Sequence, residues 1–474
     1  MKDQFASYFE KPEFKQRLAR YEDMLLCGDT RYFEATELTD IAEYYAMQGE
    51  SELAEAALDY ALRLHPDNLD ALIFKARARL INGHLNEAIN VAESITDQHD
   101  REVLFLKAEL ALANQCPAEA EEILRSILES EGGDAMSYTD IIDLLVDNKQ
   151  IDKANLWIDE ALQRHRGHRH LTESVAYGYV QQERYEEAIE LYNELLDIDA
   201  YSTLYWEELG KIYFLREEFD KAIEAFEFVI AINSEECYYA MYAAANSYFN
   251  LGNYTQAEDY YRQLHEKYPD TVDPLYHMGM CCVNKGDDDG ALEHFTHALV
   301  TVADGSDEQA LVYCQMSLIF SRKGEHEKAV AYIDEALDIY PNNAELLIMK
   351  GHELMAQGRY NECTEVFLDA LSLDAPIERS LFLIGVSMLE NNYVPIAYYI
   401  LKLLKGNPGI EDHVLYPYLC FCEWNLRTNT LKDSLTEALA ICPQKTYDIF
   451  MLEPAQGETA DAMIERLKQM KIES

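Results

Sequence analysis

The chain has 474 residues, of which 87 are acidic and 39 are basic, giving a formal net charge of −48 with histidine neutral. This balance argues against a nucleic-acid partner and against an anionic membrane surface, because both need clustered Lys and Arg. Hydrophobic residues make up 49% of the chain, too many for a disordered protein.

The beginning of the chain and its cysteines predict a cytoplasmic protein. The first residues, MKDQFASYFEKPEF, contain no apolar run after the first basic residue, so we expect no secretory signal. No window approaches the run of about 18 apolar residues that a membrane span needs. The ten cysteines include no CxxC pair, which favours reduced thiols over a disulfide framework.

Residues 1–35 are predicted to be helical and to cap the fold. Large apolar residues recur there at spacings typical of one helix face, with a break near Pro12. They are Phe5, Phe9, Phe14, Leu18, Tyr21 and Leu25. We expect this region to cover the apolar end of the segment that follows.

Residues 36–408 repeat with a period near 34. One small residue recurs at Ala54, Ala88, Ala120, Ala154, Ala188, Ala222, Ala257, Ala291, Ala329, Cys363 and Ala397. Chance does not keep such a phase over eleven units. The one spacing of 38 contains an insertion near 303–308, which we interpret as a longer turn.

Other positions keep the same phase. A larger apolar residue follows the small one by four positions in most units, as Phe226 follows Ala222, and a second small residue precedes it by twelve, as Gly210 does. A glycine often lies between the two small residues. This spacing predicts two amphipathic helices joined by a tight turn, and stacked pairs of that kind form an α-solenoid.

After 406–413 the periodic phase fades. The segments 416–426, 431–441 and 462–472 keep helical apolar spacing. Residues 409–474 are therefore predicted to be helices that close the C-terminal end of the stack.

The segment 206–226, WEELGKIYFLREEFDKAIEAF, resembles the tetratricopeptide repeat. Its signature positions are matched by Trp206, Leu209, Gly210, Tyr213, Ala222 and Phe226. The unit departs from the family pattern at Val229 and Ser234. The resemblance implies an all-α, right-handed superhelix of about eleven repeats with helical caps. It also implies that the first helix of each pair lines a concave surface that binds other proteins.

No motif of catalysis or cofactor binding is present. The sequence lacks GxGxxG after a strand, GxxxxGK[ST], HExxH and GxSxG, so we expect no catalytic residue, no cofactor and no enzyme activity. The acidic segment 285–299 lacks the oxygen pattern of a Ca²⁺ loop. His294 and His297 could form a metal pair, but ordinary helix surface is the favoured interpretation, and we expect no metal site.

The segment 164–170, RHRGHRH, departs from the acidic background. Arg164, Arg166 and Arg169 could bind an acidic partner segment or a phosphate, since guanidinium groups match such anions. Its histidines could bind a metal. The alternative, which we favour, is a helix end where cations complement the helix dipole and nearby acids.

The expected inner stripe of the first helices is aromatic and apolar where a solvated stripe would be polar. Its candidate binding residues are Phe214, Tyr239, Tyr242, Asn246, Phe249, Tyr276 and Met280. It continues with Leu318, Ile348, His352, Met355, Phe382, Val386 and Leu389. Two interpretations stay open: a groove for a peptide, in which the resemblance implies that Asn246 holds backbone, or packing against neighbouring helices.

The sequence therefore predicts a non-enzymatic scaffold or adaptor that binds an unidentified protein or peptide segment in its groove. The paired Lys and Asn residues that chaperone-binding family members use are not found. One alternative is a regulatory subunit of an enzyme complex. Another is an RNA-binding helical repeat, which the charge of −48 disfavours.

Overall fold

The structure is a computed structural model that describes residues 8–473, except 10, 236, 270, 272, 374 and 456. The predicted Phe5 lies outside the described residues. Within the described part of the chain there are 27 helices and no strand, which confirms the predicted all-α solenoid class. None of these helices combines the length and apolar character that crossing a membrane requires.

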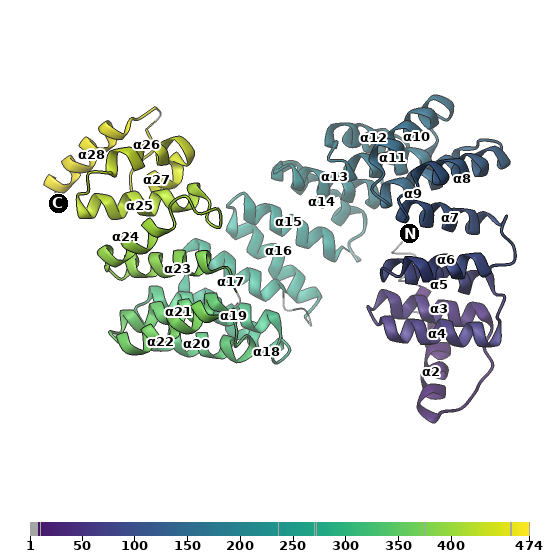
Figure 1. Cartoon of the computed structure of the whole chain (residues 1–474), viewed down its shortest axis with the longest axis horizontal. Helices are drawn as coiled ribbons and strands as arrows, with labels where there is room; N and C mark the ends of the chain where they lie inside the picture. The colour runs from purple at the N-terminus through teal and green to yellow at the C-terminus, as the bar shows by residue number, and fades with distance from the viewer. Residues whose placement is uncertain are drawn as a thin grey trace. The chain divides into compact units, whose positions relative to one another are not determined.

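The chain contacts divide the molecule into two compact units, residues 1–216 and 217–474. The helices of the first unit carry the labels of Figure 1. They are α2 (Pro12–Cys27), α3 (Ala35–Met47), α4 (Ser51–Leu64), α5 (Leu69–Ile81), α6 (Leu85–Ser94), α7 (Arg101–Ala113), α8 (Pro117–Ser130), α9 (Ala135–Asp147), α10 (Ile151–Arg164), α11 (Arg169–Gln181), α12 (Tyr185–Ile198) and α13 (Thr203–Leu215).

The second unit contains the remaining helices. They are α14 (Phe219–Ile232), α15 (Tyr238–Asn250), α16 (Tyr254–Lys267), α17 (Asp273–Lys285), α18 (Asp288–Thr301), α19 (Asp307–Arg322), α20 (His326–Ile339), α21 (Ala344–Ala356), α22 (Tyr360–Ser372), α23 (Ile377–Glu390), α24 (Val394–Leu403), α25 (Asp412–Leu426), α26 (Leu431–Ile441), α27 (Pro443–Ile449) and α28 (Ala460–Glu473).

The helices from α3 to α24 follow the predicted repeat. In chain order they form eleven successive pairs, and the recurrent small residue always lies on the second helix of its pair. All eleven of these residues are at most 5% exposed. A small side chain at this position lets two helix backbones approach closely, so the pattern read from the sequence is the packing pattern of the fold.

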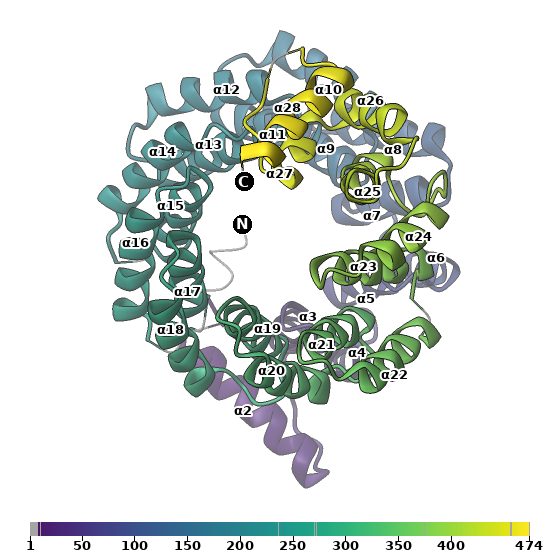
Figure 2. The same cartoon turned by 90° about the vertical axis from the view of Figure 1, so that its left-hand side faces the viewer.

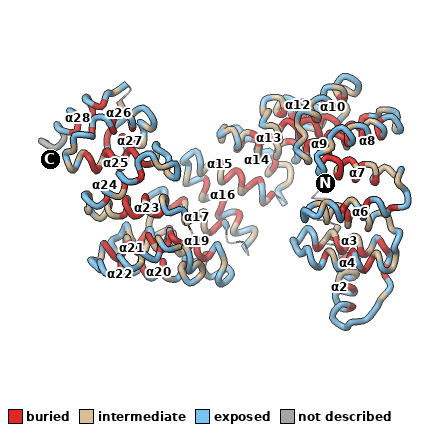
Figure 3. Tube along the Cα trace, in the orientation of Figure 1, coloured by how far each residue is buried: buried red, intermediate tan, exposed pale blue. Residues whose placement is uncertain are grey.

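Within the second unit, the first helices of the pairs lie on one side. Figure 2 shows α15, α17, α19 and α21 on the inner side of this unit and α16, α18, α20 and α22 outside them. Buried residues gather where neighbouring helices meet (Figure 3). The inner helices are therefore the ones that can present side chains to a partner.

Polar residues start many of these helices. Asp287 accepts a hydrogen bond at 3.0 Å from the backbone N–H of Gly290, and Ser306 accepts one from Gln309, so each caps the helix that follows it. The acidic segment 285–299 is thus a turn followed by a helix, in agreement with its expected place in the repeat. The insertion near 303–308 forms the link before α19.

The tight turns inside the pairs need a left-handed backbone. Six of them use glycine, with φ between 72° and 80°: Gly49, Gly83, Gly252, Gly286, Gly324 and Gly358. The other five place a residue with a side chain there, with φ between 57° and 69°: Gln115, Lys149, Glu183, Glu217 and Asn392. A side chain makes this conformation less favourable than it is for glycine.

Helices at both ends of the chain have their own apolar clusters. Phe14, Tyr21 and Met24 of α2 pack with α3 and α4. Near the other end, α25 to α28 share a cluster that includes Leu435 and Met463. The assignment of residues 1–35 and 409–474 as caps stays a prediction.

Candidate protein-binding surface

The predicted aromatic stripe lies on α15 and α17 of the second unit. Tyr239 is 47% exposed. Tyr242, Phe249, Tyr276 and Met280 are half-buried and pack against one apolar cluster. These four residues therefore contribute to packing while keeping part of their surface accessible, and their role in binding a peptide stays a prediction.

Polar groups within this stripe are bonded to one another. The Tyr242 hydroxyl and Nε2 of His277 lie 2.8 Å apart. Tyr261 donates a hydrogen bond to Oδ1 of Asn246 at 2.5 Å. The Asn246 carbonyl oxygen is thus engaged within the fold, which weakens the expectation that this side chain holds a peptide through both its amide groups.

Burial determines the protonation of this network. Burial lowers the pKa of His277, against the opposing effect of the Asp273 carboxylate. Burial also raises the pKa of Tyr242. A neutral imidazole can accept a hydrogen bond from the Tyr242 hydroxyl, and the His277 ring stacks on Tyr261 with centroids 5.0 Å apart. The arrangement fixes side-chain orientation across α15, α16 and α17.

Phe214 belongs to α13 in the first unit, where it is half-buried. On the same helix, Lys211 forms ion pairs with Glu207 at 2.6 Å and Glu208 at 2.9 Å. These ion pairs raise the pKa of Lys211, outweighing the effect of burial. The predicted stripe is therefore mixed in character in this unit: half-buried aromatic surface beside paired charges.

A pocket of about 570 Å³ lies further along the second unit, between α19, α21 and α23. Its walls include Leu318, Ile348, His352 and Val386, all on the stripe predicted from the sequence. The sequence indicated the surface but not the pocket, because the hollow depends on how three inner helices are spaced.

The charged side chains of this pocket are mostly acidic. Glu345, Glu353 and Glu390 line it together with Arg322, which pairs with Asp288. Glu353 is only 4% exposed, and its Oε2 lies 2.8 Å from Nδ1 of His326. Glu345 also pairs with Arg379, at 2.8 Å, but the lining still holds three glutamates against one arginine, so the pocket favours a cationic group on an occupant.

His352 contacts both a hydroxyl group and a carboxylate among the residues that line the pocket. Its Nδ1 lies 3.1 Å from the Ser387 hydroxyl and 3.6 Å from Glu390. It thus connects α21 with α23 in the wall of the pocket. The amide nitrogen of Asn391 also lies 3.2 Å from this Nδ1, so α23 and its C-cap residue both hold the ring.

The Arg/His segment at 164–170 lies in the first unit, where two of its three arginines pair with acids. Arg164 contacts Glu160 at 3.2 Å, and Arg169 contacts Glu173 at 3.1 Å and the Tyr205 hydroxyl at 2.8 Å. Arg166 is exposed. Internal pairing at Arg164 and Arg169 favours the structural interpretation of this segment over an anion site.

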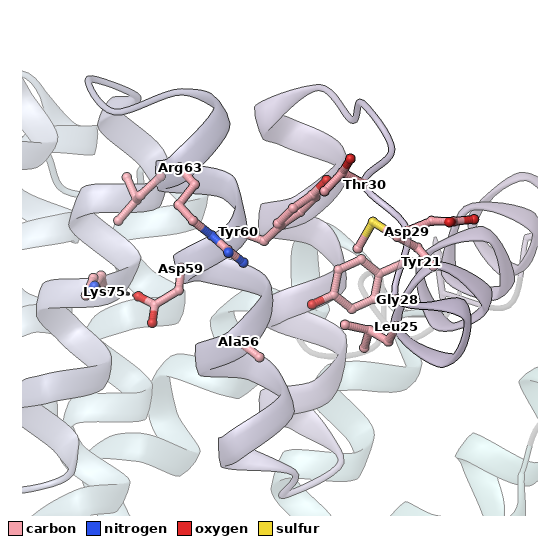
Figure 4. A pocket seen from close by; sticks show the side chains of 12 residues that line it. Tyr21, Leu25, Gly28, Asp29, Thr30, Ala56, Asp59, Tyr60, Arg63 and Lys75 are labelled. Atoms are coloured by element: carbon pink, nitrogen blue, oxygen red, sulfur yellow. Dashed lines mark hydrogen bonds and ion pairs between the residues drawn. The ribbon is translucent and has the colours of Figure 1, made fainter.

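Another pocket, of about 760 Å³, lies between α2 and α4 in the first unit. Figure 4 shows Tyr21 and Leu25 facing Ala56, Asp59 and Arg63 across it. The Tyr21 hydroxyl is buried and has no hydrogen-bond partner. Burial raises the pKa of Tyr21 to about 12. No pattern in the sequence indicated this pocket, because its walls come from α2 and from the helix pair that follows.

A carboxyl group with a raised pKa lies on α9, also in the first unit. Burial raises the pKa of Asp143 to about 6, and the nearby carboxylates of Asp147 and Asp140 act in the same direction. A hydrogen bond from Ser174 opposes the shift. Sequence analysis did not single out this residue, since its burial depends on the packing of α9 beside α11.

Sequence profiles of one family match the chain repeatedly. Tetratricopeptide repeat profiles match residues 39–98, 139–203, 176–235, 239–271, 310–343 and 344–376. These segments cover more than half of the chain and coincide with the observed helix pairs. The chain therefore belongs to the tetratricopeptide repeat family.

Several solved structures resemble parts of the chain. A tetratricopeptide repeat protein from Parabacteroides merdae is 18% identical, covering 52% of this chain and 96% of its own, with a TM-score of 0.36. YrrB, described as having an unusual peptide-binding site, is 21% identical, covering 42% and 97%, with a TM-score of 0.33. The C-terminal part of a repeat protein from Cytophaga hutchinsonii is 15% identical, covering 55% and 98%, with a TM-score of 0.40. No curated protein sequence matches the chain significantly.

Proposed function

We propose that this protein is a non-enzymatic scaffold that binds a peptide or protein segment on the inner helices of its second unit. The observation that carries the proposal is the pocket between α19, α21 and α23, because it lies on the stripe where family members present their binding residues. Concave, mainly preformed sites with a few polar groups are typical ligand sites.

The pocket chemistry indicates what kind of segment binds. Leu318, Ile348 and Val386 offer apolar surface, while three glutamates, Glu345, Glu353 and Glu390, also line the pocket. An occupant with an apolar side chain next to a lysine or arginine would satisfy both. The half-buried residues of α15 and α17, including Tyr276 and Met280, provide additional surface on the inner side of the same unit.

Selection from a random short-peptide library, displayed on phage, tests this proposal with the purified full chain. We expect enriched peptides to combine a basic residue with an apolar one. Their affinity should fall as salt rises, since salt screens the attraction to Glu345 and Glu390. Enrichment of acidic peptides, or affinity that is insensitive to salt, would contradict the proposal.

A pair of leucine variants locates the binding surface. Leu318 lines the pocket and Leu368 lies on the outer helix α22, and both side chains are exposed. Leu318→Asp should weaken binding of the selected peptides at least tenfold, whereas Leu368→Asp should leave it unchanged. Equal binding by both variants would place the peptide elsewhere. Melting curves of both variants check that the fold is retained.

A further inference from the structure

Three potential metal ligands from three consecutive helices meet in the second unit. Glu258 lies on α16, Cys282 near the end of α17, and His294 on α18. One ligand atom of each, a carboxylate oxygen, the sulfur and a ring nitrogen, all lie within 4.8 Å of one another. Nothing in the chain order suggests this group, because α16 packs on α17 and α17 on α18 only in the folded repeat.

We propose that Glu258, Cys282 and His294 form a binding site for one Zn²⁺ ion. A thiolate, an imidazole and a carboxylate are the three ligand types that zinc accepts, and a water molecule can complete a tetrahedral shell. Ligand atoms of such a site lie about 3.3–3.8 Å apart when each bond is about 2.0–2.3 Å long. The three ligand atoms thus need to approach one another by at most about 1.5 Å to coordinate one ion.

The environment of the three residues suits zinc binding. Cys282 is buried, and the Glu258 side chain is only 12% exposed. The His294 side chain is half-buried on α18, and its ring nitrogen lies within 4.8 Å of the ligand atoms of the other two residues. Arg262 bonds Oε1 of Glu258 at 2.7 Å, and such an outer contact orients a carboxylate ligand.

A cation already occupies part of this site. The Lys285 ammonium group pairs with Oε2 of Glu258, one of the two carboxylate oxygens that could bind a zinc ion. Lys285 is 30% exposed and lies at the end of α17, so its side chain can turn toward solvent. Zinc would therefore compete with this ammonium group, and it would also release the Cys282 proton on forming the metal–sulfur bond.

His297 takes no part in the group. Its spacing from His294 first suggested a metal pair, but His297 is exposed and one helical turn away. The structure instead combines His294 with residues 12 and 36 positions earlier in the chain. The site is independent of the proposed peptide surface and would clamp α16, α17 and α18 together.

The experiment uses the full chain, freed of metal by chelator, with Zn²⁺ or Co²⁺ alone as the probe. We expect one tightly bound Zn²⁺ per chain and a higher melting temperature in its presence. Co²⁺ should give the near-ultraviolet absorption of a cobalt–thiolate bond. Absence of stoichiometric Zn²⁺ binding, or of that absorption, would overturn the proposal.

Matched variants assign the ligands. Cys282→Ser should abolish the cobalt–thiolate absorption, and His294→Asn and Glu258→Gln should each weaken Zn²⁺ binding at least tenfold. Cys281→Ser changes the adjacent buried cysteine, whose thiol is not in the group, and should retain the absorption. Melting curves without metal confirm that each variant folds. Wild-type absorption in Cys282→Ser would rule out this site.

Removing the competing ammonium group should strengthen Zn²⁺ binding, whereas the three ligand substitutions should weaken it. Lys285→Met should bind Zn²⁺ more tightly than the wild type, because Oε2 of Glu258 is then free. An adventitious surface site would not respond to this substitution. Unchanged affinity in Lys285→Met would show that the ion does not bind Glu258, which would also overturn the proposal.

Discussion

Gly279 of α17 faces the ring of Phe295 of α18 so closely that a Cβ atom on Gly279 would lie 2.4 Å from Cε1 of that ring. Phe295 is fully buried, so its ring has no free space to enter. The same relationship recurs two helix pairs later, where a Cβ on Gly351 of α21 would lie 2.2 Å from Cε1 of Phe367 of α22. The second small residue of the sequence period is thus the place where a first helix touches the aromatic residue of its partner.

Gly279→Ala should destabilise the protein despite the better helix propensity of alanine. Propensity favours alanine by about 1 kcal/mol, while overpacking a core costs about 1–3 kcal/mol. We expect a lower midpoint in urea unfolding. Adding Phe295→Leu should recover part of the loss, because the smaller side chain makes room for the methyl group. Additive losses in the double variant would contradict this steric explanation.

Removing the hydroxyl groups of two tyrosines of the α2–α4 region should have opposite effects on the stability of the fold. The Tyr21 hydroxyl is buried without a partner, so Tyr21→Phe should be neutral or stabilising by about 1 kcal/mol. The Tyr60 hydroxyl donates a hydrogen bond to the Arg31 carbonyl at 2.6 Å, so Tyr60→Phe should cost about 1 kcal/mol. Calorimetric melting of the two variants measures the difference, and equal shifts would contradict it.

The raised pKa of Asp143 predicts a pH dependence. Its pKa is about 6 in the folded protein, against an ordinary value of 3.8. The stability of the fold that depends on protonated Asp143 is therefore fully present below pH 3.8 and is lost as pH rises through 6. Asp143→Asn should remove this pH-dependent loss of stability, because an amide does not ionise. We expect the variant to melt a few degrees above the wild type at pH 7.5 and at the same temperature near pH 4. A difference that does not change with pH would exclude ionisation of Asp143 as its cause.

Within the aromatic stripe, substituting a half-buried side chain should lower the stability of the fold more than substituting an exposed one. Tyr242 is half-buried and bonded to His277, so Tyr242→Ala should cost about 2–4 kcal/mol of stability. Tyr239 is 47% exposed, so Tyr239→Ala should cost less than about 1 kcal/mol. Chemical denaturation compares them. A large loss in Tyr239→Ala would make Tyr239 a packing residue and remove it from the candidate binding set.

The repeat architecture could be predicted from the sequence because it depends on local periodicity. Ala222, Ala257 and Ala291 keep a spacing of 34 or 35, and each is fully buried on its second helix. The half-burial of Tyr242 and Phe249 could not be predicted, since it depends on the distance between neighbouring first helices. For the same reason, the sequence did not bring Glu258, Cys282 and His294 together.

The charged segment at 164–170 illustrates a different limit. Composition correctly marked Arg164 and Arg169 as unusual in an acidic chain. The spacing of four residues places Glu160 beside Arg164 and Glu173 beside Arg169 on a helix surface, so the sequence did contain the signal for these ion pairs. It could not show the hydrogen bond from Arg169 to the Tyr205 hydroxyl, because that contact joins residues 36 positions apart.

Four of the five left-handed turns without glycine inside the helix pairs are consecutive along the chain, and the fifth, at Asn392, lies apart from them. Gln115, Lys149, Glu183 and Glu217 occupy four successive turns, whereas the turns at 49 and 83 before them and at 252, 286, 324 and 358 after them use glycine. In a stack of repeats each pair depends mainly on its nearest neighbours, so unfavourable turns in consecutive pairs weaken one stretch instead of being diluted along the array. Amide protons in this interior stretch should therefore exchange with deuterium sooner than those of the glycine-turn repeats, and the protein would open from within rather than fray from its ends.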